Sequence, residues 1–268
     1  MSALVLDGLT LMRGQTCTAR DCSMAFRPGE VNAILGPNGT GKSSLIKAIF
    51  GELPLKAGRI TLGDTLLSRR SLFRWRRIIG YMPQDTGVEA ALSTLEVVLL
   101  GRMDALHMHV GDDDLQAALS AMHAVGIGHL AQRDIQSLSG GQRQLALFAQ
   151  VMLRDPQVLL LDEPVSALDM HHQIVLLDHV RAETRARNLV TVMVLHDLSL
   201  AAQFSDRILL LGDGRIVAEG APDAVLTPEI IGPLYRVAVE RLIDSQGKPV
   251  IRPMARPFHQ PATGSLSP

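Results

Sequence analysis

The chain has 268 residues, of which 47% are hydrophobic and 20% are charged, and its formal net charge is −1 at pH 7. This composition suits one or two globular domains with a real core, and the balanced charge gives no support to nucleic acid as a partner. Apolar runs stay short of the roughly 18–20 residues of a membrane span, and residues 1–7 lack the features of a signal peptide.

The first functional pattern is Gly-Pro-Asn-Gly-Thr-Gly-Lys-Ser at residues 36–43, which fits the phosphate-loop pattern G-x-x-x-x-G-K-[ST]. Its glycines let backbone N–H groups approach phosphate oxygens, Lys42 can reach the β- and γ-phosphates, and Ser43 can hold Mg²⁺. A buried strand is predicted at residues 31–35 and a helix at residues 44–50, with its N-terminus toward the phosphates. The predicted nucleotide contacts here are Gly36, Pro37, Asn38, Gly39, Thr40, Gly41, Lys42, Ser43 and Ser44.

Three further apolar runs each end in a polar residue that is capable of chemistry. The runs with their following residues are 78–83 with Gln84, 158–161 with Asp162 and Glu163, and 190–195 with His196. Such continuous runs indicate parallel strands that are buried on both faces, and ligands collect at the carboxyl ends of parallel strands. We therefore expect these side chains to converge on the phosphate loop.

Asp162 and Glu163 form the second nucleotide element. At a strand tip, the carboxylate of Asp162 can hold Mg²⁺, and Glu163 is close enough to polarise an attacking water as a general base. Taken alone, an apolar run before Asp-Glu is equally well explained as an ordinary strand end. Beside a phosphate loop, it predicts hydrolysis of a nucleoside triphosphate.

Residues 86–154 are rich in Ala, Leu and Gln with helical periodicity, and we interpret them as an inserted helical subdomain. The predicted nucleotide-binding core then comprises residues 1–85 and 155–243. Residues 244–268 carry five prolines and are predicted to form a partly disordered tail.

Leu138-Ser139-Gly140-Gly141-Gln142 begins the last helical pattern of this subdomain. Ser139 is a good N-cap, and the two glycines leave the N–H groups of a helix start open to an anion. A bare Ser-Gly-Gly is often only a turn. The chain thus has two phosphate-binding helix ends but one lysine-bearing loop, which suggests that two chains share each nucleotide.

These motifs follow the order and approximate spacing of ATP-binding cassette (ABC) ATPases, which the chain resembles over about residues 3–240. The set is the phosphate loop, Gln84, residues 138–142, Asp162 with Glu163, Ser166-Ala167-Leu168-Asp169, and His196. The resemblance implies an α/β fold: a P-loop NTPase (RecA-like) core with a mainly parallel sheet, an N-terminal antiparallel β subdomain and the inserted helical subdomain.

The resemblance also implies a head-to-tail dimer with ATP and Mg²⁺ held between the phosphate loop of one chain and the signature motif of the other. The signature contacts would be Ser139, Gly140, Gly141 and Gln142. The other roles implied are Glu163 as general base, His196 on the γ-phosphate, Asp169 at the dimer contact, and Gln84 linking the metal to a permease. Ser43, Gln84 and Asp162 are the predicted metal contacts.

A narrower resemblance, to importers of iron chelates and cobalamin, rests on residues 93–102, 169–173, 196–202 and 225–231 with Tyr235. It implies a subunit on the cytoplasmic face of the inner membrane, bound to a transmembrane permease dimer and served indirectly by a periplasmic substrate-binding protein. Heme or ferric siderophore is the favoured cargo, and cobalamin is a weaker one. The alternatives are a soluble ABC ATPase not coupled to transport and, outside the family, a P-loop kinase or GTPase.

Two alternatives stay open at this level. Val97, Val98 and Leu99 either receive a permease helix or fill the core of the helical subdomain. Family members usually carry an aromatic residue that stacks on adenine near residues 11–14, where this chain has Leu-Met-Arg-Gly. Arg13 either stacks through its planar guanidinium or is a solvent-exposed turn residue.

Overall fold

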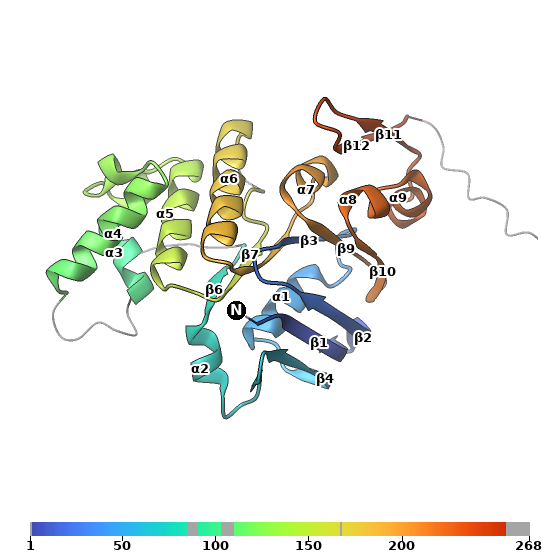
Figure 1. The fold of residues 1–268 in the computed structure, drawn as a ribbon, viewed down its shortest axis with the longest axis horizontal. Helices are drawn as coiled ribbons and strands as arrows, with labels where there is room; N and C mark the ends of the chain where they lie inside the picture. Colours follow the sequence, from blue (N-terminus) through green and yellow to red (C-terminus); the bar gives the residue numbers. More distant parts are fainter. Residues whose placement is uncertain (1, 85–90, 103–109, 167, 256–268) are drawn as a thin grey trace, which may run out of the picture.

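The main sheet of the computed structural model has six strands in the order β10-β9-β3-β8-β7-β6 (Figure 1). The structure describes residues 2–84, 91–102, 110–166 and 168–255. Pairing within the sheet is parallel except between β9 and β10. The strands are β3 (Val31–Leu35), β6 (Ile79–Met82), β7 (Val158–Asp162), β8 (Val190–Val194), β9 (Arg207–Gly212) and β10 (Arg215–Gly220).

The central strands are buried on both faces because successive side chains point into two different cores. On β3, Ala33 belongs to the core beneath the helices, whereas Ile34 belongs to the core shared with the N-terminal sheet. On β7, Leu159 likewise belongs to the core beneath the helices, and Leu160 belongs to the core shared with the N-terminal sheet. A strand buried on both faces requires a continuous apolar run. The four strands predicted from such runs are confirmed to within one residue at each end.

A second, antiparallel sheet of order β2-β1-β4-β5 covers one face of the molecule. Its strands are β1 (Leu4–Arg13), β2 (Thr16–Phe26), β4 (Leu55–Leu62) and β5 (Thr65–Leu66). Helix α1 (Lys42–Phe50) buries Leu45, Ile46 and Ile49 between the two sheets. On α2 (Leu72–Arg77), the fully buried Trp75 donates its indole N–H to the carbonyl of Ile49 at 2.8 Å.

A group of helices lies at one end of the molecule in Figure 1. It comprises α3 (Thr94–Leu99), the 3-10 turns Leu100–Arg102, Gly128–Leu130 and Ile135–Ser137, α4 (Asp112–Ala124) and α5 (Gly140–Leu153). Ser93 and Glu96 form a reciprocal capping box that fixes the start of α3. Val97 and Val98 are fully buried and Leu99 is 7% exposed, so these side chains fill the core and are not available to a permease.

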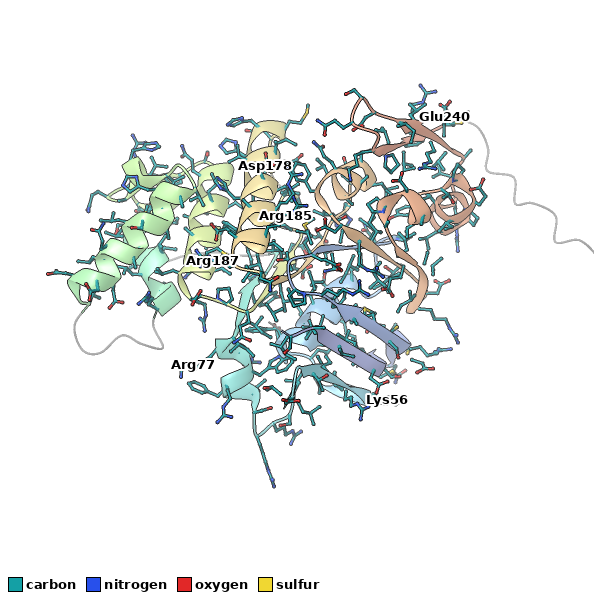
Figure 2. The ribbon with its side chains drawn as sticks, viewed as in Figure 1. Lys56, Arg77, Asp178, Arg185, Arg187 and Glu240 are labelled. Carbon is teal, nitrogen blue, oxygen red and sulfur yellow. The ribbon has the colours of Figure 1, made fainter. Side chains whose placement is uncertain are left out.

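Helices α6 (Met170–Ala186) and α7 (Leu198–Phe204) pack over the main sheet. Two arginines at the C-terminal end of α6 are labelled in Figure 2. Arg187 pairs with Glu183 at 2.6 Å, and Arg185 donates at 3.3 Å to Asp206, which also accepts the backbone N–H of Val31. This end of α6 is thereby tied to the first residue of β3.

The chain continues through α8 (Pro222–Val225) and α9 (Pro228–Tyr235) into a hairpin of β11 (Val239–Ile243) and β12 (Pro249–Pro253). These elements lie at the end of the molecule opposite α3, α4 and α5 (Figure 1). Residues 249–253 of the predicted tail thus form a strand. The Ile251 side chain anchors this strand because it is buried in the core, with 8% of its surface exposed. The domain boundaries stay a prediction, and the one between residues 85 and 86 lies outside the described residues, as does most of the tail. Within the described ranges, each helix is too short or too polar to cross a membrane.

The burial of α3 predicts the effect of truncating Val98. Val98→Ala should lower the free energy of unfolding by about 1–3 kcal/mol, because two buried methyl groups are lost and a cavity remains. Gln116→Ala, on the exposed side of α4, should change it by less than about 0.5 kcal/mol. Urea denaturation of both variants checks this, and equal stabilities would contradict the core assignment.

Candidate nucleotide site

The register of the main sheet brings the predicted polar residues to one edge. Ile34 on β3 pairs with Val194 on β8, and Val194 pairs with Asp162 on β7, so the three strands reach the same level. Gly36 and His196 each follow two residues beyond that level. Parallel strands with this register deliver their following loops to the same place, as the sequence predicted.

The phosphate loop is held in a conformation that only glycine allows at two points. A Cβ atom on Gly36 would lie 2.2 Å from the carbonyl oxygen of Leu211, and one on Gly41 would lie 2.1 Å from that of Thr18. Gly41 has φ of +101°, in the left-handed region. Helix α1 begins at Lys42, two residues before its predicted start. Its N-terminus therefore lies directly at the end of the loop.

Lys42 lies inside this loop, although lysine is rarely buried. Its side chain donates to the carbonyls of Gly36 at 2.7 Å and of Pro37 at 2.9 Å, and the residue is 5% exposed. Burial lowers the pKa of Lys42, while the carboxylates of Glu163 and Asp162 act in the opposite direction. The ammonium group is therefore held inside the loop by two of the loop's own carbonyls.

Ser43 and Asp162 connect the phosphate loop to β7. The Ser43 hydroxyl donates to Asp162 Oδ1 at 3.0 Å, and Asp162 is 2% exposed. Burial raises the pKa of Asp162, and the hydrogen bond from Ser43 lowers it. Among the described residues, His, Cys, Asp and Glu form no group of three that could hold a metal ion. A hydroxyl and a single carboxylate fit Mg²⁺, which takes few protein ligands and completes its shell with phosphate and water.

Glu163 is held from both sides by the residues that follow the neighbouring strands. Its Oε2 accepts from Gln84 Nε2 at 2.9 Å, and its Oε1 lies 2.6 Å from His196 Nε2. Because an ionised carboxylate only accepts, His196 carries a proton on Nε2 in this pairing. The backbone of Glu163 has φ of +54°, which is an uncommon value for a residue other than glycine.

These groups surround a pocket of about 360 Å³. The predicted site residues that line it are Asn38, Gly39, Gly41, Lys42, Ser43, Ser44, Gln84, Glu163 and His196. Arg13 and Thr18, from β1 and β2, also line it. Thr18 was not among the predicted contacts, whereas for Arg13 the sequence left stacking on the base open. For Thr18 the sequence held no signal, because only the pairing of β1 with β2 brings it to the loop.

The signature residues, 139–142, lie outside this pocket. Ser139 caps α5 by accepting from the N–H of Gln142 at 3.3 Å, and the Gln142 side chain accepts in return from the N–H of Ser139 at 3.2 Å. None of Ser139, Gly140, Gly141 and Gln142 lines the pocket formed by the described residues. One chain therefore does not bring its signature motif to its own phosphate loop.

Asp169 lies beside the signature motif. It caps α6 by accepting from the N–H of His172 at 2.9 Å, and the His172 ring contacts the same carboxylate at 2.9 Å. A Cβ atom on Gly141 would lie 2.3 Å from that ring, so the two helix starts are in close contact. Ala167, which belongs to the same Ser166–Asp169 motif, lies outside the described residues.

A phosphate loop between a buried parallel strand and a helix, with an aspartate at the tip of another parallel strand that accepts from the loop serine, defines a P-loop nucleoside triphosphatase. The family model described as ABC transporter matches residues 19–166. The chain belongs to the ABC transporter family and is an ATPase of that family.

Relatives and solved structures agree with this membership. A hemin import ATP-binding protein from Hahella chejuensis is 39% identical over 236 residues, covering 85% of this chain and 91% of the relative. A cobalamin import ATP-binding protein from Halobacterium salinarum is 37% identical, covering 88% of this chain and 60% of the relative. A metal-chelate type ABC transporter in an inward-facing conformation superimposes with a TM-score of 0.83 and 26% identity, covering 96% of this chain and 99% of that one.

Proposed function

We propose that this chain is the ATP-hydrolysing subunit of an inner-membrane importer for an iron chelate, with heme as the first candidate. The observation that supports hydrolysis is the pocket that Lys42, Ser43 and Glu163 line, with Asp162 hydrogen-bonded to Ser43 beside it. The identities to hemin import proteins support the cargo, since several such relatives are 36–41% identical to this chain.

The phosphate end of the site follows from the residues already in position. Lys42 meets the β- and γ-phosphates as a compact cation, and the N–H groups at the start of α1 donate hydrogen bonds to the phosphate oxygens. Ser43 and Asp162, together with Gln84, would hold Mg²⁺, which neutralises phosphate charge when bound. The proposed nucleotide contacts remain residues 36–44.

Glu163 serves as the general base in this proposal. Its carboxylate takes the proton of a water that attacks the γ-phosphate, and His196 stabilises the same phosphate by donating a hydrogen bond. In the structure both carboxylate oxygens are already hydrogen-bonded, to Gln84 and to His196. An ionised carboxylate has about four acceptor positions, so a water can bind Glu163 beside Gln84 and His196.

A second copy of the chain would complete each site. Ser139, Gly140, Gly141 and Gln142 lie away from their own chain's pocket, and so does Asp169, so that a head-to-tail partner can present them to the nucleotide. A dimeric ATP-binding cassette bound to ADP and Pi shares the fold, with a TM-score of 0.73. Closure of such a dimer on ATP, followed by hydrolysis, gives the two states that an importer needs.

The same relatives support a proposal for the wider assembly. We place the subunit on the cytoplasmic face of the inner membrane, bound to a permease dimer that receives cargo from a periplasmic binding protein. Ferric siderophore and cobalamin are the other cargoes considered, the second because a cobalamin import protein is 37% identical. A soluble ABC ATPase not coupled to transport is the alternative, and copurification with a permease separates the two.

The role of Glu163 predicts a selective loss of chemistry. Glu163→Gln keeps the size and hydrogen bonding of the side chain but removes its basicity, so turnover should fall by about 10²–10⁴ while ATP still binds. Glu219→Gln makes the same change outside the pocket and should leave turnover within about twofold of wild type. Phosphate release and ATP binding measured on both variants are the test, and normal turnover in Glu163→Gln would remove the assignment.

The shared site predicts the behaviour of a mixed dimer. A Lys42→Ala chain combined with a Gly140→Asp chain has one intact site and one doubly damaged site, whereas each parent homodimer has two damaged sites. Residual ATPase should therefore appear only in the mixture. If the mixture is as inactive as both parents, either the arrangement across two chains or the independence of the two sites is wrong.

The cargo is tested in the source organism by deleting the gene for this chain. Growth with heme as the sole iron source should be lost and then restored by the wild-type chain, but not by Glu163→Gln. Growth on inorganic iron is the matched control and should be unaffected. If growth on heme persists while growth on a ferric siderophore or on limiting cobalamin fails, the cargo is one of those instead.

A further inference from the structure

The turn that follows β7 carries Glu163 in a backbone conformation that its neighbour disfavours. Glu163 precedes Pro164 and has φ of +54°, whereas a residue before proline prefers an extended conformation with negative φ. A conformation that opposes the local preference persists only where surrounding contacts hold it. The position of the Glu163 carboxylate therefore depends on the contacts that hold this turn.

Most of those contacts are local in sequence. The Glu163 carbonyl accepts from the N–H of Ser166 at 3.3 Å and from its hydroxyl at 3.2 Å. Gln173, in the first turn of α6, donates to the carbonyls of Val165 at 3.2 Å and Leu168 at 3.1 Å. These bonds fix the shape of the turn and join it to the helix that follows it in the chain.

Gln144 on α5 supplies a contact from a distant part of the chain. Its side-chain amide donates to the carbonyl of Pro164 at 2.9 Å. Pro164 is buried and has no N–H, so this carbonyl is the backbone group of the residue that needs a partner. The bond fixes the peptide group next to Glu163 against α5.

The place of Gln144 separates this contact from nucleotide binding. Gln144 does not line the pocket that the described residues form around the phosphate loop. It lies about one helical turn beyond Gly140, the first residue of α5. An effect of Gln144 on hydrolysis would therefore pass through the turn that carries Glu163 or through the signature motif, residues 139–142.

We propose that Gln144 is a positioning residue that holds Glu163 in the orientation required of the general base. This proposal rests on the proposed function. The amide of Gln144 anchors Pro164, so that the Glu163 carboxylate stays beside the γ-phosphate end of the pocket without rearrangement during the reaction. Without this bond the turn would relax toward the conformation that proline favours, and the carboxylate would spend less time in its reactive position. ATP binding, which depends on Lys42 and the phosphate loop, would not change.

Steady-state ATPase assays on the full chain test this role with two variants. Gln144→Met keeps the length of the side chain without a donor, and Gln144→Glu keeps its shape but only accepts when ionised. Each should lower kcat by about ten- to hundredfold and leave the KM for ATP within about twofold of wild type, because a misplaced base costs chemistry and not binding.

The matched control is Gln150→Met, the same change further along α5. In the described part of the chain, Gln150 is not hydrogen-bonded to the turn. Its kcat and KM should both stay within about twofold of wild type. A normal kcat in both Gln144 variants would overturn the proposal, and so would a rise in KM that accounts for the whole loss of kcat/KM. A lowered melting temperature with an unchanged kcat would also contradict it, because Gln144 would then only satisfy a buried carbonyl.

The mixed dimer of Lys42→Ala and Gly140→Asp chains shows on which element Gln144 acts. Its intact site takes Glu163 from the Gly140→Asp chain and the signature motif from the Lys42→Ala chain. Gln144→Met should therefore remove most of the residual ATPase when it is placed in the Gly140→Asp chain, and little when it is placed in the Lys42→Ala chain. The reverse result, or an equal loss from both placements, would mean that Gln144 acts through the signature motif, and the assignment to Glu163 would be wrong.

Glu163→Gln in the same assay separates failure of this proposal from failure of the proposed function. If Glu163→Gln loses turnover while the Gln144 variants keep it, the general base stands and only the positioning role is wrong. If Glu163→Gln keeps normal turnover, the general-base assignment itself is wrong and the role of Gln144 falls with it.

Discussion

The parallel pairing of β7 with both β6 and β8 is the constraint on which the site depends. Glu163 follows β7, and its two carboxylate oxygens are contacted by Gln84, which follows β6, and by His196, which follows β8. Three segments that are widely separated in sequence meet because their strands are neighbours with matched register. If one strand slipped by a single residue, the side chain at its tip would move to the other face of the sheet.

Strands β3, β6, β7 and β8 of the main sheet could be predicted because each is a continuous apolar run, the pattern that burial on both faces requires. Strands β9 and β10 were not predicted, and β10 alternates exposed and half-buried residues. The order of those strands could not be predicted, since no local feature states which strand lies beside which. For this reason the convergence of Glu163 with its neighbours was expected only in outline, and the specific contacts of Gln84 and His196 with it were not. Thr18 was missed for the same reason, because it reaches the pocket only through the pairing of the N-terminal sheet.

Other differences have local causes. As a pattern, the apolar residues Val97 and Val98 satisfy a core and an interface equally well, and only the packing of α3 against α4 and α5 decides between the two. The stretch after residue 244 looked like a tail because of its prolines. Pro249 and Pro253 in fact bound β12, at strand ends where proline is tolerated, and Ile251 between them anchors the hairpin.

The contact between Gly141 and His172 has a mechanical consequence. Glycine is usually regarded as a source of looseness in a chain, but here the missing side chain lets an imidazole from α6 rest directly on the first turn of α5. Asp169 holds that imidazole through its ring nitrogen, so the two helix starts are joined by a short, stiff bridge. In a head-to-tail dimer, residues 139–142 and Asp169 would therefore meet the second chain as one rigid unit.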